Sequence, residues 1–382
     1  MTHRTARFRG TCVALCALLV VLSGCSSDVS RPAADTSSVV PARTLDPATV
    51  TVAIEDYIRH GSAGLRNIRA VLISVDGVTQ VAHYRDGLPT DRAHVFSVTK
   101  SVLSTLVGIA VSEGILKGLD QDLRTLLPEY REEMSAADAS ITLEQLLTMT
   151  SGIPEGTLEE DPRLDNADYV REILRGGTVE PSGTKWIYSD PAADVLAAVL
   201  TAALRRQDGR QPRTLLEYAR QKLFDPLDIQ TRPAYTGFEG NEPLSAKFND
   251  VGFGWATDHR GRHYGCCMLK LTAEDMVKIG QLYLEDGRWK GRQIVPADWV
   301  AAATTPIQLE SAYGRMWWIR DIGAHHAFFA QGRAGQLVAV VPDLRVVVAI
   351  STHLDTKNET NKYMQGEDLL PMINDLVLSR LE

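Results

Sequence analysis

The chain has 382 residues, of which 44% are hydrophobic and 23% are charged, so it can bury a globular core. This hydrophobic content, together with six tryptophans, excludes a disordered chain. Asp and Glu outnumber Lys and Arg by 48 to 40, which gives a net charge of −8. That balance argues against a nucleic-acid partner, because phosphate backbones are bound by dense positive charge.

The N-terminus is typical of an export signal. A basic region is formed by Arg4, Arg7 and Arg9. The uncharged stretch 11–22 that follows is too short to cross a ~30 Å hydrocarbon core as a helix. It leads into Leu-Ser-Gly-Cys at residues 22–25, which resembles a bacterial lipobox. We therefore expect residues 1–24 to be removed and Cys25 to carry a lipid; the alternative is a plain secretory signal with an incidental cysteine.

A lipid on Cys25 would hold the protein at the cell membrane, with its domain on the extracytoplasmic side. Residues 25–48 are predicted to be a flexible tether, since they are rich in Ser, Pro and Ala. Residues 49–382 are predicted to form one domain. Its two cysteines, Cys266 and Cys267, are neighbours that could bridge only through a strained ring, so we expect buried free thiols.

The domain begins with a predicted helix over 49–60. Two strands follow, 67–75 and 78–84, and they are joined at Asp76-Gly77, a strong hairpin signal.

A strongly apolar helix is predicted over 97–113, closed by Gly114. Residues 115–230 are predicted to be mostly helical, with long loops.

Strands return near the C-terminus, at 311–320, 325–331, 336–341 and 345–352. Their near-continuous Val, Ile and Leu content indicates a sheet that is covered on both faces. An amphipathic helix predicted over 362–381 could supply one cover. The pattern indicates a sheet built from both ends of the chain, with a helical lobe inserted between them and a ligand cleft at the seam.

Lys100 is the first residue that suggests chemistry. It is the only Lys, Arg, Asp or Glu in the apolar stretch 93–112. A buried lysine must find partners or lower its pKa, and a lysine of lowered pKa can accept a proton at neutral pH. Ser97 lies three residues earlier, on the same helical face and at the positive helix N-terminus. The alternative is that Ser97 only caps the helix and Lys100 extends to the surface.

A second candidate segment runs from Pro181 to Pro191. Asp190 precedes a helix that begins at Pro191, which an N-cap would explain. Tyr188 has no such structural role, and a phenol beside an ammonium loses its proton more easily. Tyr188 is therefore a candidate general base for a serine hydroxyl.

The third candidate segment, residues 330–336, lies at a strand edge and contains Gly332 and Arg333. Small residues let a substrate lie close to the backbone, where a strand N–H can point at an oxyanion. The alternative is a glycine-rich bend between strands.

Together these segments resemble the serine β-lactamase and penicillin-binding-protein superfamily. Ser97-Val-Thr-Lys100 resembles its S-x-x-K motif, Tyr188-Ser-Asp190 its Y-x-N motif, and Ala330-Gln-Gly332 its K-T-G motif. The similarity extends over roughly residues 49–380. It is strongest to the branch that holds the 6-aminohexanoate-dimer hydrolases and the β-lactamase-fold esterases.

The resemblance implies an α/β fold, with an antiparallel sheet flanked by N- and C-terminal helices and an inserted, mainly helical lobe. It implies a serine hydrolase that cleaves an amide or ester of a small-molecule or peptide-like substrate without cofactor or metal. Ser97 would be acylated, and Lys100 and Tyr188 would share the proton transfers. The backbone N–H groups of Ser97 and Arg333 would form the oxyanion hole, supported by Asp190 and Gly332.

Two departures from the family motifs affect the choice between possible functions. Ala330 replaces the lysine of K-T-G, which weakens a DD-peptidase or β-lactamase assignment unless Arg333 substitutes for that lysine. Asp190 stands where asparagine is usual, and an ionised Asp190 would hold Lys100 protonated. Both departures favour a third possibility, a binding module that has kept the fold without catalysis.

Other candidate sites are weaker. We expect no metal at His259 and His263, which flank a predicted turn, or at the pair His325-His326, whose side chains would point to opposite faces of a strand. Trp186 and Trp317-Trp318 could line a pocket, although core packing is the default for such residues.

Overall fold

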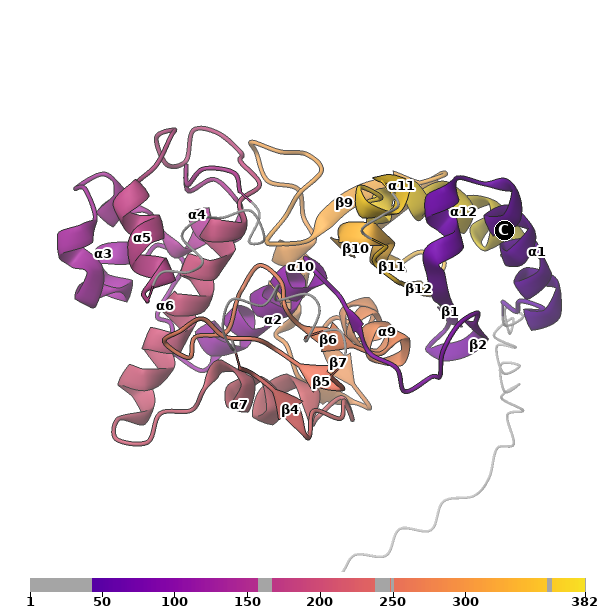
Figure 1. Cartoon of the computed structure of the whole chain (residues 1–382), viewed down its shortest axis with the longest axis horizontal. Coiled ribbons are helices and arrows are strands. Elements are labelled where there is room, and N and C mark those ends of the chain that lie inside the picture. Colours follow the sequence, from indigo (N-terminus) through magenta and orange to yellow (C-terminus); the bar gives the residue numbers. More distant parts are fainter. Residues whose placement is uncertain (1–42, 157–166, 238–247, 249–250, 356–358, 382) are drawn as a thin grey trace, which may run out of the picture. The chain divides into compact units, whose positions relative to one another are not determined.

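The fold contains a six-stranded sheet in the order β2-β1-β12-β11-β10-β9, in which every neighbouring pair is antiparallel (Figure 1). The strands are β1 (Ile68–Val75), β2 (Val78–Tyr84), β9 (Trp318–Ile322), β10 (His325–Gly332), β11 (Gln336–Val341) and β12 (Val346–Thr352). The predicted hairpin is confirmed, since Asp76 and Gly77 both have the positive φ that a tight two-residue turn requires. The pairing of β1 with β12 joins the two ends of the domain, as predicted.

Both faces of the sheet are covered. Val338 and Val340 of β11 belong to one hydrophobic cluster, and Leu337 and Ala339 to another, so alternate residues face different cores. Helices α2 (Val98–Ser112), α6 (Asp190–Asp208) and α9 (Ala273–Leu284) belong to the first cluster, and α1 (Pro47–His60) and α12 (Leu370–Leu376) to the second. This double cover explains the continuous apolar content of the strands.

The inserted lobe is mainly helical, as predicted. Besides α2 and α6, its helices are α3 (Leu123–Leu126), α4 (Leu143–Leu147), α5 (Tyr169–Gly176) and α7 (Leu215–Ala219). Short strands follow, namely β4 (Ala234–Tyr235), β5 (Phe253–Gly254), β7 (Arg288–Trp289) and β8 (Arg292–Gln293), as does α10 (Ala297–Ala303). A further pair, β3 (Ala93–His94) with β6 (Lys270–Leu271), places the segment around residue 268 beside the start of α2.

Two boundary predictions are wrong. The strand predicted over 311–320 begins only at Trp318, because the residues before it form turns and Met316 adopts a φ of 62°, which a strand does not allow. The helix predicted over 362–381 is broken into α11 (Glu359–Lys362), α12 and short 3₁₀ turns. Pro371 lies in the first turn of α12, where proline starts a helix.

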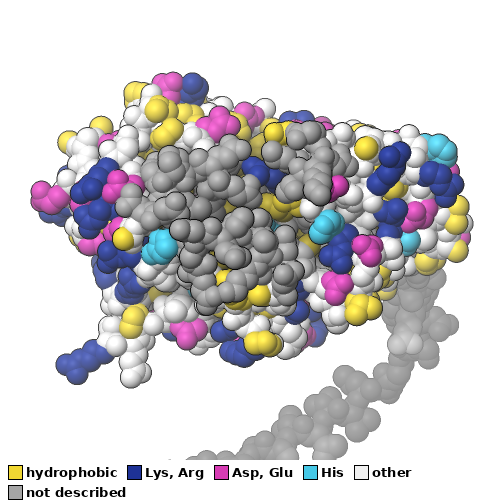
Figure 2. Space-filling view, viewed as in Figure 1, with side chains coloured by type: hydrophobic (Ala, Val, Ile, Leu, Met, Phe, Trp, Pro, Cys, Tyr) yellow, Lys and Arg dark blue, Asp and Glu magenta, His cyan; other side chains and the backbone are white. Residues whose placement is uncertain are grey.

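The structure describes residues 43–156, 167–237, 248, 251–355 and 359–381. The predicted signal peptide, Cys25 and most of the tether lie outside the described residues. No described helix has the length and apolar character needed to span a bilayer. On the face shown in Figure 2, basic and acidic side chains are interspersed over the described surface.

Candidate active site

Ser97 lies where α2 begins, but its side chain does not cap the helix. Ser97 Oγ instead accepts a hydrogen bond from Lys100 Nζ at 2.8 Å, so the capping interpretation is wrong. The preceding residue, Phe96, has a φ of 47°, a left-handed conformation that is uncommon for residues other than glycine. Such backbone outliers cluster at active sites, and this one immediately precedes the serine.

Lys100 is buried and does not reach the surface; its side chain is 1% exposed. Besides Ser97 Oγ, its ammonium donates to Asp190 Oδ1 at 2.6 Å and to the Cys266 carbonyl at 2.9 Å. All three N–H donors of the ammonium are therefore used. Burial alone would lower the pKa of Lys100, but Asp190 raises it well above its ordinary value. Of the two outcomes expected for a buried lysine, Lys100 therefore shows the first: it has found partners, and it is a cation at neutral pH.

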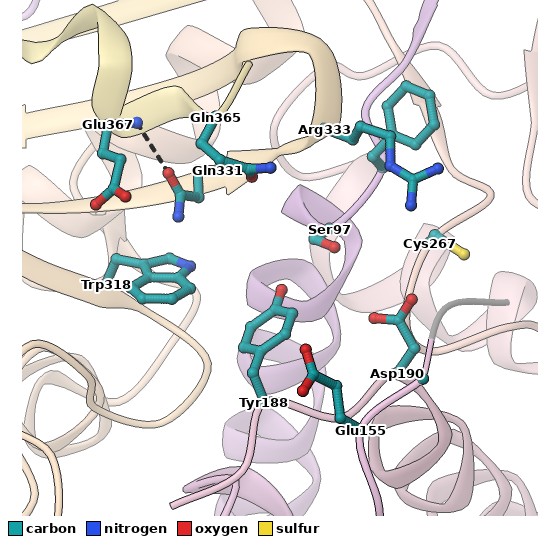
Figure 3. A pocket seen from close by; sticks show the side chains of 12 residues that line it. Ser97, Glu155, Tyr188, Asp190, Cys267, Trp318, Gln331, Arg333, Gln365 and Glu367 are labelled. Carbon is teal, nitrogen blue, oxygen red and sulfur yellow. Dashed lines mark hydrogen bonds between the residues drawn. The ribbon is translucent and has the colours of Figure 1, made fainter. Parts of the chain in front are cut away.

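Tyr188 approaches Ser97 from the segment before α6 (Figure 3). It lines the same cavity as Ser97, and Lys100 Nζ lies 4.9 Å from the centroid of its ring. Burial raises the pKa of Tyr188, and although Lys100 opposes this effect, the pKa stays above its ordinary value. The sequence argument for an easily ionised phenol is thus wrong: Tyr188 is neutral in the resting site.

The sequence suggested that Asp190 is the N-cap of α6, but Asp190 is the first residue of this helix. Ser189 is the cap, and its hydroxyl accepts from the Ala192 N–H at 3.1 Å. The carboxylate of Asp190 is consequently available to pair with Lys100. Its side chain is 13% exposed and lines the same cavity as Ser97.

The end of β10 runs directly beside the serine. A Cβ atom on Gly332 would lie 2.3 Å from the Val95 carbonyl oxygen and 3.1 Å from the Ser97 nitrogen, so only glycine permits this approach. Arg333 follows and lines the cavity, where Figure 3 shows its side chain above Cys267. Ala330 lies within the core and provides no cation to the site.

These residues surround a cavity of about 320 Å³. Its lining consists of Phe96, Ser97, Glu155, Gly156, Tyr188, Asp190, Cys267, Trp318, Gln331, Arg333, Gln365 and Glu367. Trp318 and Tyr188 form an aromatic side, with ring centroids 5.5 Å apart. Beside Trp318, Gln331 Oε1 accepts from the Glu367 N–H at 2.9 Å, as the dashed line in Figure 3 shows.

Several lining residues were not predicted from the sequence. Glu155, Gln365 and Glu367 belong to no motif and lie far from the three candidate segments along the chain, so no local signal could have found them. Trp318 was named only as one of three tryptophans that could line a pocket. The structure separates the tandem pair, since Trp318 lines the cavity and Trp317 is fully buried in the core.

Cysteine and histidine side chains take structural positions. Cys266 and Cys267 are free and buried, as predicted. His263 Nδ1 bonds the Trp255 carbonyl at 2.8 Å, and His325 Nδ1 lies 2.6 Å from Asp343. Within the described residues, no group of three or more His, Cys, Asp or Glu is arranged to hold a metal ion.

Comparisons with known proteins identify the family of the chain. The profile of the Beta-lactamase family matches residues 54–370. Lovastatin esterase of Penicillium rubens is 27% identical over 226 residues, which cover 50% of this chain and 54% of the esterase. Protein flp of Staphylococcus aureus is 25% identical over 171 residues, which cover 43% of this chain and 31% of that protein. The chain thus spans about half, or less, of the length of these relatives.

Among solved structures, a Bacillus anthracis protein assigned as a 6-aminohexanoate-dimer hydrolase superposes with a TM-score of 0.58 at 18% identity. The superposition covers 82% of this chain and 79% of that one, and it shows a shared fold. The antiparallel sheet with its inserted helical lobe and the family match over most of the length confirm the predicted resemblance. The chain belongs to the Beta-lactamase family.

Proposed function

We propose that this protein is a serine hydrolase that cleaves an amide or ester bond through an acyl-enzyme on Ser97. The observation that carries the proposal is the buried Lys100 ammonium, which donates a hydrogen bond to Ser97 Oγ and lies 4.9 Å from the centroid of the Tyr188 ring. A fully partnered cation beside a serine hydroxyl at a cavity wall stabilises negative charge on that oxygen.

In the proposed reaction, Ser97 Oγ attacks the substrate carbonyl carbon and the C–O or C–N bond to the leaving group breaks. Tyr188 accepts the serine proton as it donates its own proton to the leaving group, which agrees with a neutral phenol. Lys100 remains a cation and stabilises the charge that develops on Ser97 Oγ. The backbone N–H groups of Ser97 and Arg333 receive the oxyanion, while Gly332 lets this strand edge come close enough. Water then releases the acyl group by the reverse proton path.

Small-molecule or peptide-like amides and esters are the proposed substrates, in keeping with an esterase among the relatives. The position of the K-T-G lysine is filled by the buried Ala330, so it supplies no cation for the carboxylate of a β-lactam or wall peptide. This feature favours an esterase or amidase over a DD-peptidase or β-lactamase.

The test is intact-mass analysis of the purified protein after reaction with a fluorophosphonate and, separately, with a penicillin. We expect one fluorophosphonate adduct, lost in Ser97→Ala, and no stable penicillin adduct. A folded protein that reacts with neither reagent would contradict the proposed catalysis and favour the non-catalytic binding module. A penicillin adduct on Ser97 would favour the wall-peptide assignment.

We also propose that Cys25 is lipid-modified and that this lipid anchors the protein to the cell membrane, with the domain on the extracytoplasmic side. The lipobox-like residues 22–25 and the preceding basic region support the proposal. Cells fed an alkyne-tagged fatty acid should label the wild-type protein and not Cys25→Ser. A Cys25→Ser protein that remains labelled and in the membrane fraction would contradict it.

A further inference from the structure

Asp194 is a buried carboxylate that the proposed reaction does not use. It lies one turn after Asp190 on α6 and is the only charged residue in the apolar stretch 192–204. Its side chain is 4% exposed, and its Oδ2 atom has no hydrogen-bond partner. Burying a carboxylate in such surroundings costs free energy of folding, which suggests that Asp194 has a role in the site.

The contacts of its other oxygen point to that role. Asp194 Oδ1 accepts from the backbone N–H groups of Gly265 and Cys266, at 2.7 and 3.1 Å. The carbonyl of the same Cys266 accepts from Lys100 Nζ at 2.9 Å. Asp194 therefore fixes the two backbone N–H groups that immediately precede the Cys266 carbonyl, which is one of the three acceptors of the ammonium.

Two carboxylates on successive turns of α6 thus hold Lys100, Asp190 directly and Asp194 through the backbone. The approach is close, because a Cβ on Gly265 would lie 2.1 Å from the Ala193 carbonyl oxygen. A shift of this segment would move the Cys266 carbonyl away from Lys100. The ammonium would then lose an acceptor and its fixed position beside Ser97 Oγ.

We propose that Asp194 is a positioning residue for the Ser97 reaction, acting through the Gly265–Cys266 backbone to hold the Lys100 ammonium against Ser97. The inference rests on the proposed function. The charged and titratable groups that face Asp194 are Asp190, Lys100, Tyr264, Cys266 and Cys267. Among them Lys100 is the cation.

The experiment compares Asp194→Ala with Asp194→Asn by following fluorophosphonate labelling of Ser97 over a range of reagent concentrations. Asparagine keeps an Oδ1 acceptor at the same place, whereas alanine removes it. For Asp194→Ala we expect the maximal labelling rate to fall about tenfold or more with unchanged half-saturation, as misplacement of a reacting group does. Asp194→Asn should keep the rate within about threefold of the wild type, because the positioning contacts remain.

Thr201→Val is the matched control, since it removes a buried polar group from the same helix, where Thr201 Oγ1 bonds the Ala197 carbonyl. It should lower the melting temperature and leave the labelling rate unchanged. If Asp194→Ala does not fold, Asp194→Ser, whose hydroxyl is too short to serve both N–H groups, takes its place.

Labelling of Asp194→Ala (or Ser) at the wild-type rate would overturn the inference, as would an equal loss in Asp194→Asn. Absence of labelling in the wild-type protein would instead refute the proposed function, so the two failures are distinguishable.

Discussion

At the scale of single residues, the site depends on how one ammonium is satisfied. A buried charge is tolerated when it is paired and hydrogen-bonded, and Lys100 has an acceptor for each of its three N–H groups. Asp190 determines the charge state, because its attraction outweighs the burial that would otherwise neutralise the lysine. The residue that the family motif would make an asparagine therefore selects a cationic Lys100.

Asp190→Asn should consequently change the pH dependence of acylation. Without the carboxylate, burial dominates and the pKa of Lys100 falls. The wild-type labelling rate should stay level as the pH rises from about 7 to about 10, whereas the variant should lose rate within that window as its lysine deprotonates. The rates are measured with a fluorophosphonate against pH, with Glu180→Gln, an exposed carboxylate paired with Lys185, as control. A variant that reacts faster than the wild type at neutral pH would show that neutral Lys100 is the working base.

The candidate residues could be predicted from the sequence, but their charge states could not. The spacing of Ser97 and Lys100 on one helix is a local property, and it placed the two side chains together correctly. Besides Ser97, the two hydrogen-bond partners of the Lys100 ammonium lie 90 and 166 residues away along the chain. One of them is a backbone carbonyl, which no side-chain motif reveals.

At the scale of elements, the site is the place where α2 begins beside the end of β10. The contact is between backbones: Gly332 faces the Val95 carbonyl and the Ser97 nitrogen. β3, which ends three residues before Ser97, pairs with β6 and so holds the start of this segment. The serine is therefore positioned by fixed elements on both sides, which favours a preorganised site.

Gly332→Ala should damage this arrangement. Gly332 has a φ of −137°, which any residue can adopt, so the effect comes only from the added methyl group. Because the atoms it meets belong to the backbone, β10 or the Val95–Ser97 segment must move, at a cost of roughly 1–3 kcal/mol. We expect a lower free energy of unfolding in urea and at least about tenfold slower labelling of Ser97. Gly252→Ala, which meets open space, is the control; equal behaviour of the two variants would contradict the predicted contact.

At the scale of the whole molecule, the order of elements was predictable and the contacts between distant segments were not. Alternating and continuous apolar patterns predicted the sheet from both chain ends and the helical insertion. The strand near 311–320 was placed too early because apolar content does not reveal the left-handed turn at Met316. Contacts such as Asp194 with Gly265–Cys266 depend on how the insertion folds back, which local sequence patterns do not reveal.

Folding as a whole should depend on pH through His263. Its side chain is buried, and burial lowers its pKa from 6.5 to about 4. As the pH falls, His263 is therefore protonated near pH 6.5 in the unfolded chain but only near pH 4 in the folded protein. Stability is lost as the pH falls through this window. At 1.36 kcal/mol per pKa unit, the loss between pH 7 and pH 5 is about 2 kcal/mol from this residue.

Other groups titrate in the same range, so a comparison of variants isolates the effect. Asp194 acts in the opposite direction, since burial raises its pKa to about 7 and the folded protein binds its proton more tightly than the unfolded chain. His263→Asn keeps a donor for the Trp255 carbonyl but cannot titrate. In urea unfolding followed by tryptophan fluorescence, its loss of stability from pH 7 to pH 5 should be about 2 kcal/mol smaller than that of the wild type. His60→Asn, at an exposed position, should behave as the wild type. An equal pH dependence in His263→Asn and the wild type would mean that the folded protein accommodates a protonated His263.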